Sequence, residues 1–241
     1  MIFENFLVLG RTVPEKSKKY GEKICMAGVD LELNQLLRIY PLPIKNEFKA
    51  GHVYRVSTVD ARPKDPRHES WKINIGQKPR KTGEYLTPKK RIEILKNVVA
   101  PKTILQANTE KKSLAAIFTD CIQLKMKIRN EIIDPAQLQL FESFYLQETQ
   151  QIKTANNFRK APYINFNDGT NHCLQLREWG VYELLRKKDA TGAELTANLK
   201  LNDRRNFCII AGNMAKHRNT WLAISIISER FERQNQLFSQ L

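Results

Sequence analysis

Short apolar runs separated by polar or turn residues fill the first quarter of the chain. They are rich in β-branched and aromatic residues, which suit a pleated, half-buried surface. Pro41 and Pro43 end the third run, because proline cannot donate a hydrogen bond to a strand ladder. The pattern predicts a small antiparallel barrel or sandwich. Its strands are expected at residues 6–12, 24–31, 36–40 and 52–59.

A charged arm follows the last of these strands. Residues 62–71 combine two prolines with several cationic side chains and end on Trp71. From Arg62 to Arg91 the chain has ten Lys and Arg residues against three Asp and Glu residues. Residues 76–88 are rich in glycine and proline, which predicts a mobile loop. The arm is therefore the main candidate for contact with a polyanion.

Helical and extended signals alternate in the middle of the chain. Thr87 and Pro88 suit the N-cap and first position of a helix, and apolar residues follow them at helical spacing. Residues 114–118 predict a helical turn. Residues 121–129 alternate strictly, which predicts a half-buried strand with a basic outer face. Residues 135–150 predict a further helix.

The last third of the chain returns to strand signals. The strongest is the pair Asp168-Gly169, which lies between two strand-like runs and predicts a hairpin. Helices are expected at residues 179–188 and 192–202, and buried strands at residues 207–212 and 220–227. The expected organisation is an N-terminal barrel with its basic arm at 1–92, a mixed helical insert with one strand at 93–157, and a C-terminal β-rich unit at 158–241.

The composition narrows the class of partner. A net charge of +15 favours nucleic acid first and an anionic membrane surface second, with a solvated basic surface as the alternative. The four cysteines are far apart and lie in apolar or strand-like runs, which predicts reduced core thiols and neither disulfides nor a zinc site. No stretch approaches 18 consecutive apolar residues and no basic leader is present, so a cytoplasmic protein without a membrane span is expected.

Three short motifs resemble a family of uncharacterised bacterial proteins related to the dual OB-containing domains. They are Cys25-x-Ala-Gly-Val, Leu37-Arg-Ile-Tyr-Pro-x-Pro, and Asp65-x-Arg-x-Glu-Ser-Trp71, and weaker likenesses continue to the final strand. The resemblance implies two small OB-like barrels and nucleic-acid binding, often in a mobile-element or defence setting, with no established reaction. Where relatives carry acid-Trp-acid, this chain has Glu178-Trp179-Gly180, which argues against a carboxylate pair there.

With this resemblance the expected fold is α+β and β-rich, with two small OB-like antiparallel barrels and a helical insert between them. An OB barrel binds single strands through a basic groove and aromatic stacking platforms. Trp71 is either such a platform or a core residue. The candidate nucleic-acid-binding residues are Arg38, Tyr40, Arg62, Lys64, Arg67, His68, Trp71, Lys72, Lys78, Arg80, Lys81, Lys89, Lys90 and Arg91.

Catalysis is the less favoured alternative. Asp65, Arg67 and Glu69 alternate along an extended segment, which suits an ion-pair network that pins the arm to the barrel. The catalytic candidates are Asp65, His68 and Glu69. In this interpretation Glu69 or Asp60 would be a base or metal ligand, and His68 an acid–base group. The chain has no phosphate-binding glycine loop and no nucleophile elbow, and no cofactor or metal is expected.

The sequence therefore favours a nucleic-acid-binding protein of low sequence specificity, with DNA or RNA as its partner. An enzyme acting on nucleic acid or nucleotides, and a protein-binding subunit of a larger complex, remain as alternatives.

Overall fold

A computed structural model describes most of the chain. The described residues are 1–17, 21–44, 46–61, 67, 69–128, 160–188, 190–202, 205–214 and 217–229. The expected helix at 135–150 lies outside them. Within this part of the chain, no helix is long and apolar enough to span a membrane.

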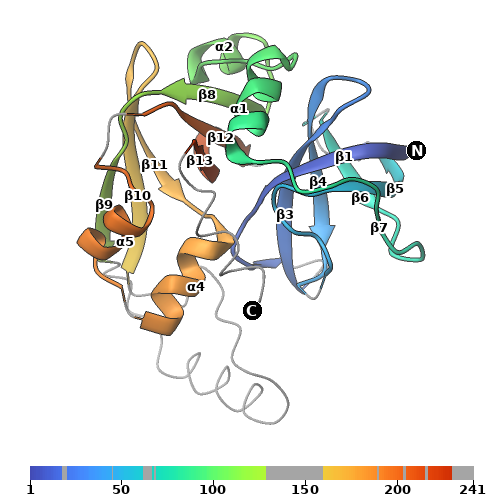
Figure 1. Ribbon diagram of the computed structural model, residues 1–241, viewed down its shortest axis with the longest axis horizontal. Coiled ribbons are helices and arrows are strands. Elements are labelled where there is room, and N and C mark those ends of the chain that lie inside the picture. Colours follow the sequence, from blue (N-terminus) through green and yellow to red (C-terminus); the bar gives the residue numbers. More distant parts are fainter. Residues whose placement is uncertain are drawn as a thin grey trace.

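The N-terminal half forms a closed β-barrel (Figure 1). Its strands are β1 (Ile2–Arg11), β2 (Glu15–Ser17), β3 (Gly21–Asp30), β4 (Gln35–Leu42), β5 (Val53–Ala61), β6 (Ser70–Ile73) and β7 (Arg80–Lys81). β1 closes the barrel because its first half pairs with β5 and its second half with β3. The order is β1-β3-β4-β6-β5 and back to β1, with β4 and β6 parallel. Without the short β2 and β7, this is the five-stranded Greek-key order of an OB barrel.

The C-terminal half repeats this topology. Its strands are β8 (Leu114–Thr119), β9 (Gln123–Ile128), β10 (Lys160–Asn167), β11 (Asn171–Leu176), β12 (Phe207–Met214) and β13 (His217–Ser228). The sheet order is β8-β12-β13-β11-β10-β9, with β11 and β13 parallel. β8 pairs with β12 and β9 with β10, so these two strands together take the place that β1 has in the first barrel. The fold is thus β-rich, with two OB-like barrels.

Four helices are described, and one of them links the barrels. They are α1 (Pro88–Asn97), α2 (Ile104–Thr109), α4 (Trp179–Lys188) and α5 (Gly192–Asn198). Thr87 caps α1 by accepting a hydrogen bond from the Lys90 N–H, as the sequence predicts. Ile92 and Leu95 of α1 are buried in one apolar cluster with strand residues of both barrels. The barrels therefore share part of their core and pack as neighbours in Figure 1.

Beyond the first barrel, two local predictions are confirmed and one is wrong. The alternating run at 121–129 is confirmed as a strand, β9, and the Asp168-Gly169 hairpin is confirmed as the turn between β10 and β11. The helical turn expected at 114–118 is wrong, because these residues form β8. β8 and β9 belong to the second sheet, so part of the stretch assigned to the 93–157 insert builds the C-terminal barrel.

Candidate nucleic-acid interface

The connection between β5 and β6 is the basic arm of the sequence. Its residues Arg62, Lys64, Asp65 and His68 lie outside the described part of the chain. Arg67 is half-buried, and its Nη1 donates to the carbonyl of Asn213 at 3.4 Å. Asn213 lies near the end of β12, just before the connection to β13. The arm of the first barrel therefore meets the end of β12 in the second.

Glu69 fixes the far end of the arm to the second barrel. Its two carboxylate oxygens accept hydrogen bonds from the N–H of Ser113 at 2.8 Å and from the Ser113 hydroxyl at 3.0 Å. Ser113 is buried and immediately precedes β8. Both carboxylate oxygens of Glu69 therefore accept hydrogen bonds from the residue that leads into the second barrel.

Arg38 does not face solvent, which corrects its assignment to a nucleic-acid surface. It is 1% exposed and donates to the carbonyl of Ser113 at 2.9 Å and to the Ser113 hydroxyl at 3.4 Å. Gly212 of the second barrel lies against its guanidinium. Arg38 therefore belongs to the seam between the barrels, where a nucleic acid has no access.

Arg91 is also buried, so its assignment is corrected in the same way. It lies on the inner side of α1, is 3% exposed and donates from Nη2 to the Tyr85 hydroxyl at 3.4 Å. Burial lowers the pKa of its guanidinium, against the opposing effects of Tyr85 and Glu178. Its neighbours Lys89 and Lys90 point outward and are exposed.

The aromatic candidates are on β4 and β6 of the first barrel. Trp71 is half-buried, packs on the barrel core and meets Phe3 edge to face with ring centroids 5.3 Å apart. It thus has one side in the core and one side near solvent. Tyr40 is half-buried on β4, two residues beyond Arg38. Both rings are therefore partly exposed.

The remaining predicted cations are exposed. They lie on β6, in the loop after it, on β7 and in the first turn of α1. They are Lys72, Lys78, Arg80, Lys81, Lys89 and Lys90. Long-range electrostatic attraction of a polyanion requires only that such charges be accessible and of one sign.

The outer face of β3 and β4 is closed. In an OB barrel the second and third strands form the usual oligonucleotide face, together with the loops after the first and fourth strands. Here Ala27, Val29 and Leu36 on that face belong to the apolar cluster shared with the second barrel. Arg38 lies on the same face and is buried. An OB site in the first barrel would therefore have to use the two loops.

One of these two loops was not selected by the sequence reasoning. The connection from β1 to β3 carries Lys16, Lys18 and Lys19 in its sequence. The other loop is the basic arm between β5 and β6. Lysine content alone did not distinguish the first loop from ordinary polar loops. The strand order supplies the missing signal, because it assigns both segments to the positions at which OB barrels bind.

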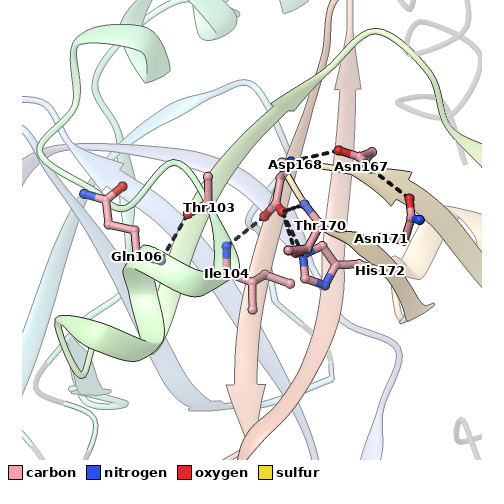
Figure 2. A network of polar contacts seen from close by, with 9 residues as sticks. Thr103, Ile104, Gln106, Asn167, Asp168, Thr170, Asn171 and His172 are labelled. Carbon is pink, nitrogen blue, oxygen red and sulfur yellow. Dashed lines mark hydrogen bonds and ion pairs between the residues drawn. The ribbon is translucent and has the colours of Figure 1, made fainter.

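A polar network joins the β10–β11 turn to α2 (Figure 2). Asp168 accepts a hydrogen bond from the N–H of Ile104 at 2.8 Å and contacts His172 Nε2 at 2.7 Å. Thr170 also contacts His172 Nε2, at 2.8 Å. A Ser-His-Asp type relay needs both ring nitrogens, one for the acid and one for the nucleophile. Because both contacts use Nε2, the arrangement anchors the turn to the helix and is not a nucleophilic triad.

The pKa of Asp168 reflects this anchoring. Burial alone would raise it, but the Ile104 N–H, the hydrogen bond and charge of His172 and the Thr170 N–H together lower the pKa below its ordinary value. Among the described residues, no group of three or more His, Cys, Asp and Glu side chains lies close enough to hold a metal ion.

Glu178 is a buried carboxyl group at the junction of the two barrels. It accepts hydrogen bonds from the Ser225 hydroxyl at 3.2 Å and the Ile226 N–H at 3.1 Å. Its backbone pairs with Thr12 of the first barrel. Burial raises the pKa of Glu178 to about 7, although both hydrogen bonds and the charge of Arg91 oppose the shift.

We expect Glu178→Gln to change the pH dependence of stability. The folded protein holds this proton more tightly than the unfolded chain, whose pKa is near 4.5. The contribution of Glu178 is therefore most favourable below pH 4.5 and is lost as the pH rises to about 7. Glutamine is neutral throughout, so its stability relative to wild type should rise by about 2–3 kcal/mol across this range.

Urea denaturation at intervals between about pH 4.5 and pH 8 measures this difference. Glu93→Gln, at an exposed position of α1, is the matched control and should show no comparable trend. A constant difference between Glu178→Gln and wild type would contradict the prediction.

Comparisons with known proteins add little to this geometry. A model of a domain of unknown function, DUF8758, matches residues 3–101. This match spans the first barrel and α1. A comparison with curated proteins found no match.

Two solved structures resemble the chain at low similarity. The Ifi202 HINa domain, solved in complex with 20 bp double-stranded DNA, is 10% identical with a TM-score of 0.36, covering 95% of this chain and 98% of that one. The p204 HINb domain is 9% identical with a TM-score of 0.35, covering 93% and 95%. Similarity at this level is not evidence of a shared function.

Proposed function

We propose that this protein binds nucleic acid with low sequence specificity, through the basic loops of its N-terminal barrel. The observation that carries the proposal is the strand order. It assigns the β1–β3 connection and the β5–β6 connection to the two loop positions that OB barrels use for oligonucleotides. In sequence, both connections are rich in Lys and Arg.

The exposed cations of the first barrel support the same proposal. Lys72 on β6, Arg80 and Lys81 on β7, and Lys89 and Lys90 on α1 add positive charge near the barrel surface. Lysine contacts phosphate as a compact point charge and carries little base information. A surface of this kind favours affinity that depends on charge, with weak sequence preference.

The second barrel adds cations next to the arm. The contact between Arg67 and the carbonyl of Asn213 brings the β5–β6 connection beside the end of β12. The chain that follows β12 contains Lys216, His217 and Arg218 in its sequence. A polyanion on the arm would thus meet cationic segments from both barrels.

Binding should weaken steeply with salt. Each phosphate neutralised by Lys or Arg releases a condensed counterion, so the logarithm of the affinity falls linearly with the logarithm of salt concentration. With about five contacts to a single strand, the expected slope is about −3.5. Fluorescence anisotropy with single- and double-stranded DNA and RNA, at several salt concentrations and with and without magnesium, measures it.

A double substitution tests whether the cations of the arm supply the salt-dependent part of the affinity. Arg62→Ser with Lys64→Ser should lower affinity and reduce the size of the slope by about 1–2. Lys96→Ser with Lys188→Ser removes the same charge at exposed positions away from the arm and should leave the slope closer to wild type. Affinity that is undetectable at about 50 mM salt, or independent of salt, would refute nucleic-acid binding.

A further inference from the structure

The outer side of β9, β10 and β11 forms a second polar strand face. Tyr163 of β10 is paired with Lys125 of β9 and with Gln175 of β11. Two residues further along β10, Asn165 is paired with Gln123 and Cys173 of the same two strands. Paired residues of neighbouring strands point to the same side of a sheet. The alternate pair Ile164 and Leu174 lies in the barrel core. The polar residues therefore face outward together.

This face is accessible among the described residues. Gln123, Lys125, Lys127 and Cys173 are exposed, and Tyr163 is half-buried. Its border lies at Gln175, which is buried and donates from Nε2 to the Tyr182 hydroxyl of α4 at 3.2 Å.

The two barrels differ at this position. β9 shares the place of β1 with β8, and β10 and β11 are equivalent to β3 and β4 of the first barrel. The equivalent face of the first barrel is filled by the shared apolar cluster and by buried Arg38. The face on β10 and β11 is the one that remains open for an oligonucleotide in the usual OB position.

Tyr163 and two lysines supply the chemistry for a single strand. The Nζ of Lys127 lies 4.3 Å from the centroid of the Tyr163 ring, a cation–π contact. Lys125 stands directly opposite Tyr163 in the ladder. An unpaired base can replace Lys127 on the ring by stacking, and the released ammonium then reaches the adjoining phosphate.

We propose that this face binds single-stranded nucleic acid, with a base stacked on Tyr163 and phosphates held by Lys125 and Lys127. The proposal rests on the proposed function and extends it from the first barrel to the second. A duplex fits poorly, because its bases are stacked on one another and cannot lie on the ring.

The test compares three variants with a charge-matched control. Anisotropy titrations use labelled oligothymidylate and oligouridylate of about 20 nucleotides, long enough for two OB sites. Tyr163→Ala should weaken binding about 5- to 50-fold, and Tyr163→Phe should retain most of it. Lys125→Ser with Lys127→Ser should weaken binding and reduce the salt slope by about 1–2. Lys96→Ser with Lys188→Ser, already described as a control, should have a smaller effect.

The outcomes separate this face from nucleic-acid binding as a whole. If wild type binds and all three variants match the control, the proposed role of this face is wrong and the proposed function stands. If wild type binds no nucleic acid, both are wrong. If Tyr163→Ala weakens a duplex of equal length as much as a single strand, stacking is wrong.

Cys173 provides a readout that leaves the face intact. In a Cys121→Ser background, Cys173 is the exposed cysteine, since Cys25 is half-buried and Cys208 is buried. Bound oligothymidylate should slow alkylation of Cys173 by a maleimide at least several-fold. An unchanged rate at saturating oligonucleotide would overturn the proposal, even if Tyr163→Ala does not fold.

Discussion

Gly28→Ala is expected to lower the free energy of unfolding by about 3 kcal/mol or more. Gly28 lies in β3, paired with Val8 of β1 and Leu37 of β4. A Cβ at this position would overlap the Phe6 ring and lie 2.5 Å from the carbonyl oxygen of Leu7. Phe6 is fully buried, and the carbonyl belongs to a strand that closes the barrel, so neither can move freely. For a chain of this length the melting temperature should fall by about 6–12 °C.

Gly180→Ala is the matched control for Gly28→Ala. Gly180 is in α4, and a Cβ there would meet nothing within 4 Å. Alanine lowers the conformational entropy of the unfolded chain and has a better helix propensity, so this variant should be neutral or more stable by up to about 1 kcal/mol. Equal melting temperatures for the two variants would contradict the packing described around Gly28.

Arg38→Ala is expected to destabilise the protein by about 2–4 kcal/mol and to leave the affinity of the folded protein for nucleic acid unchanged. The substitution removes both hydrogen bonds from the guanidinium to Ser113 and leaves a void in the seam between the barrels. Ser113 then has a buried carbonyl without this donor. Thermal denaturation measures the first effect, and anisotropy corrected for the folded fraction measures the second.

Lys72→Ala controls for the loss of a positive charge. Lys72 is exposed on β6, and its removal should change stability by less than about 0.5 kcal/mol. Should Arg38→Ala weaken binding at an unchanged melting temperature, Arg38 would contact nucleic acid and the buried role would be wrong.

Local signals in the sequence were sufficient for much of the fold. Strand-like runs, the Asp168-Gly169 turn and the Thr87 cap each act over a few residues, and each is visible without knowledge of distant contacts. Residues 114–118 show where this reasoning fails. A continuous apolar run fits a buried helix turn or a strand covered on both faces.

The structure explains the ambiguity of that run. Ala115 and Ile117 of β8 lie in the core of the second barrel, whereas Leu114 and Ala116 lie in the cluster shared with the first. Both faces of β8 are therefore apolar, and no alternation appears in the sequence.

Arg38 and Arg91 were misplaced for a related reason. A cation in a basic chain is normally exposed, and local sequence does not reveal which face of a barrel a second barrel covers. The signal that was available is the apolar character of both faces of β4, with Leu36 on one side and Leu37 and Ile39 on the other. Such a strand predicts burial on both sides, and hence burial of Arg38 between its neighbours.

The shared cluster between the barrels also bears on how the protein folds and how it can be divided. Its apolar side chains come from β1, β3, β4 and β5 on one side and from β8, β12 and β13 on the other, with α1 between them. Neither half can bury this surface alone, so cutting the chain between the barrels would expose contiguous apolar area on both fragments. The halves repeat one topology, but we expect them to unfold together and neither half to fold as an independent module.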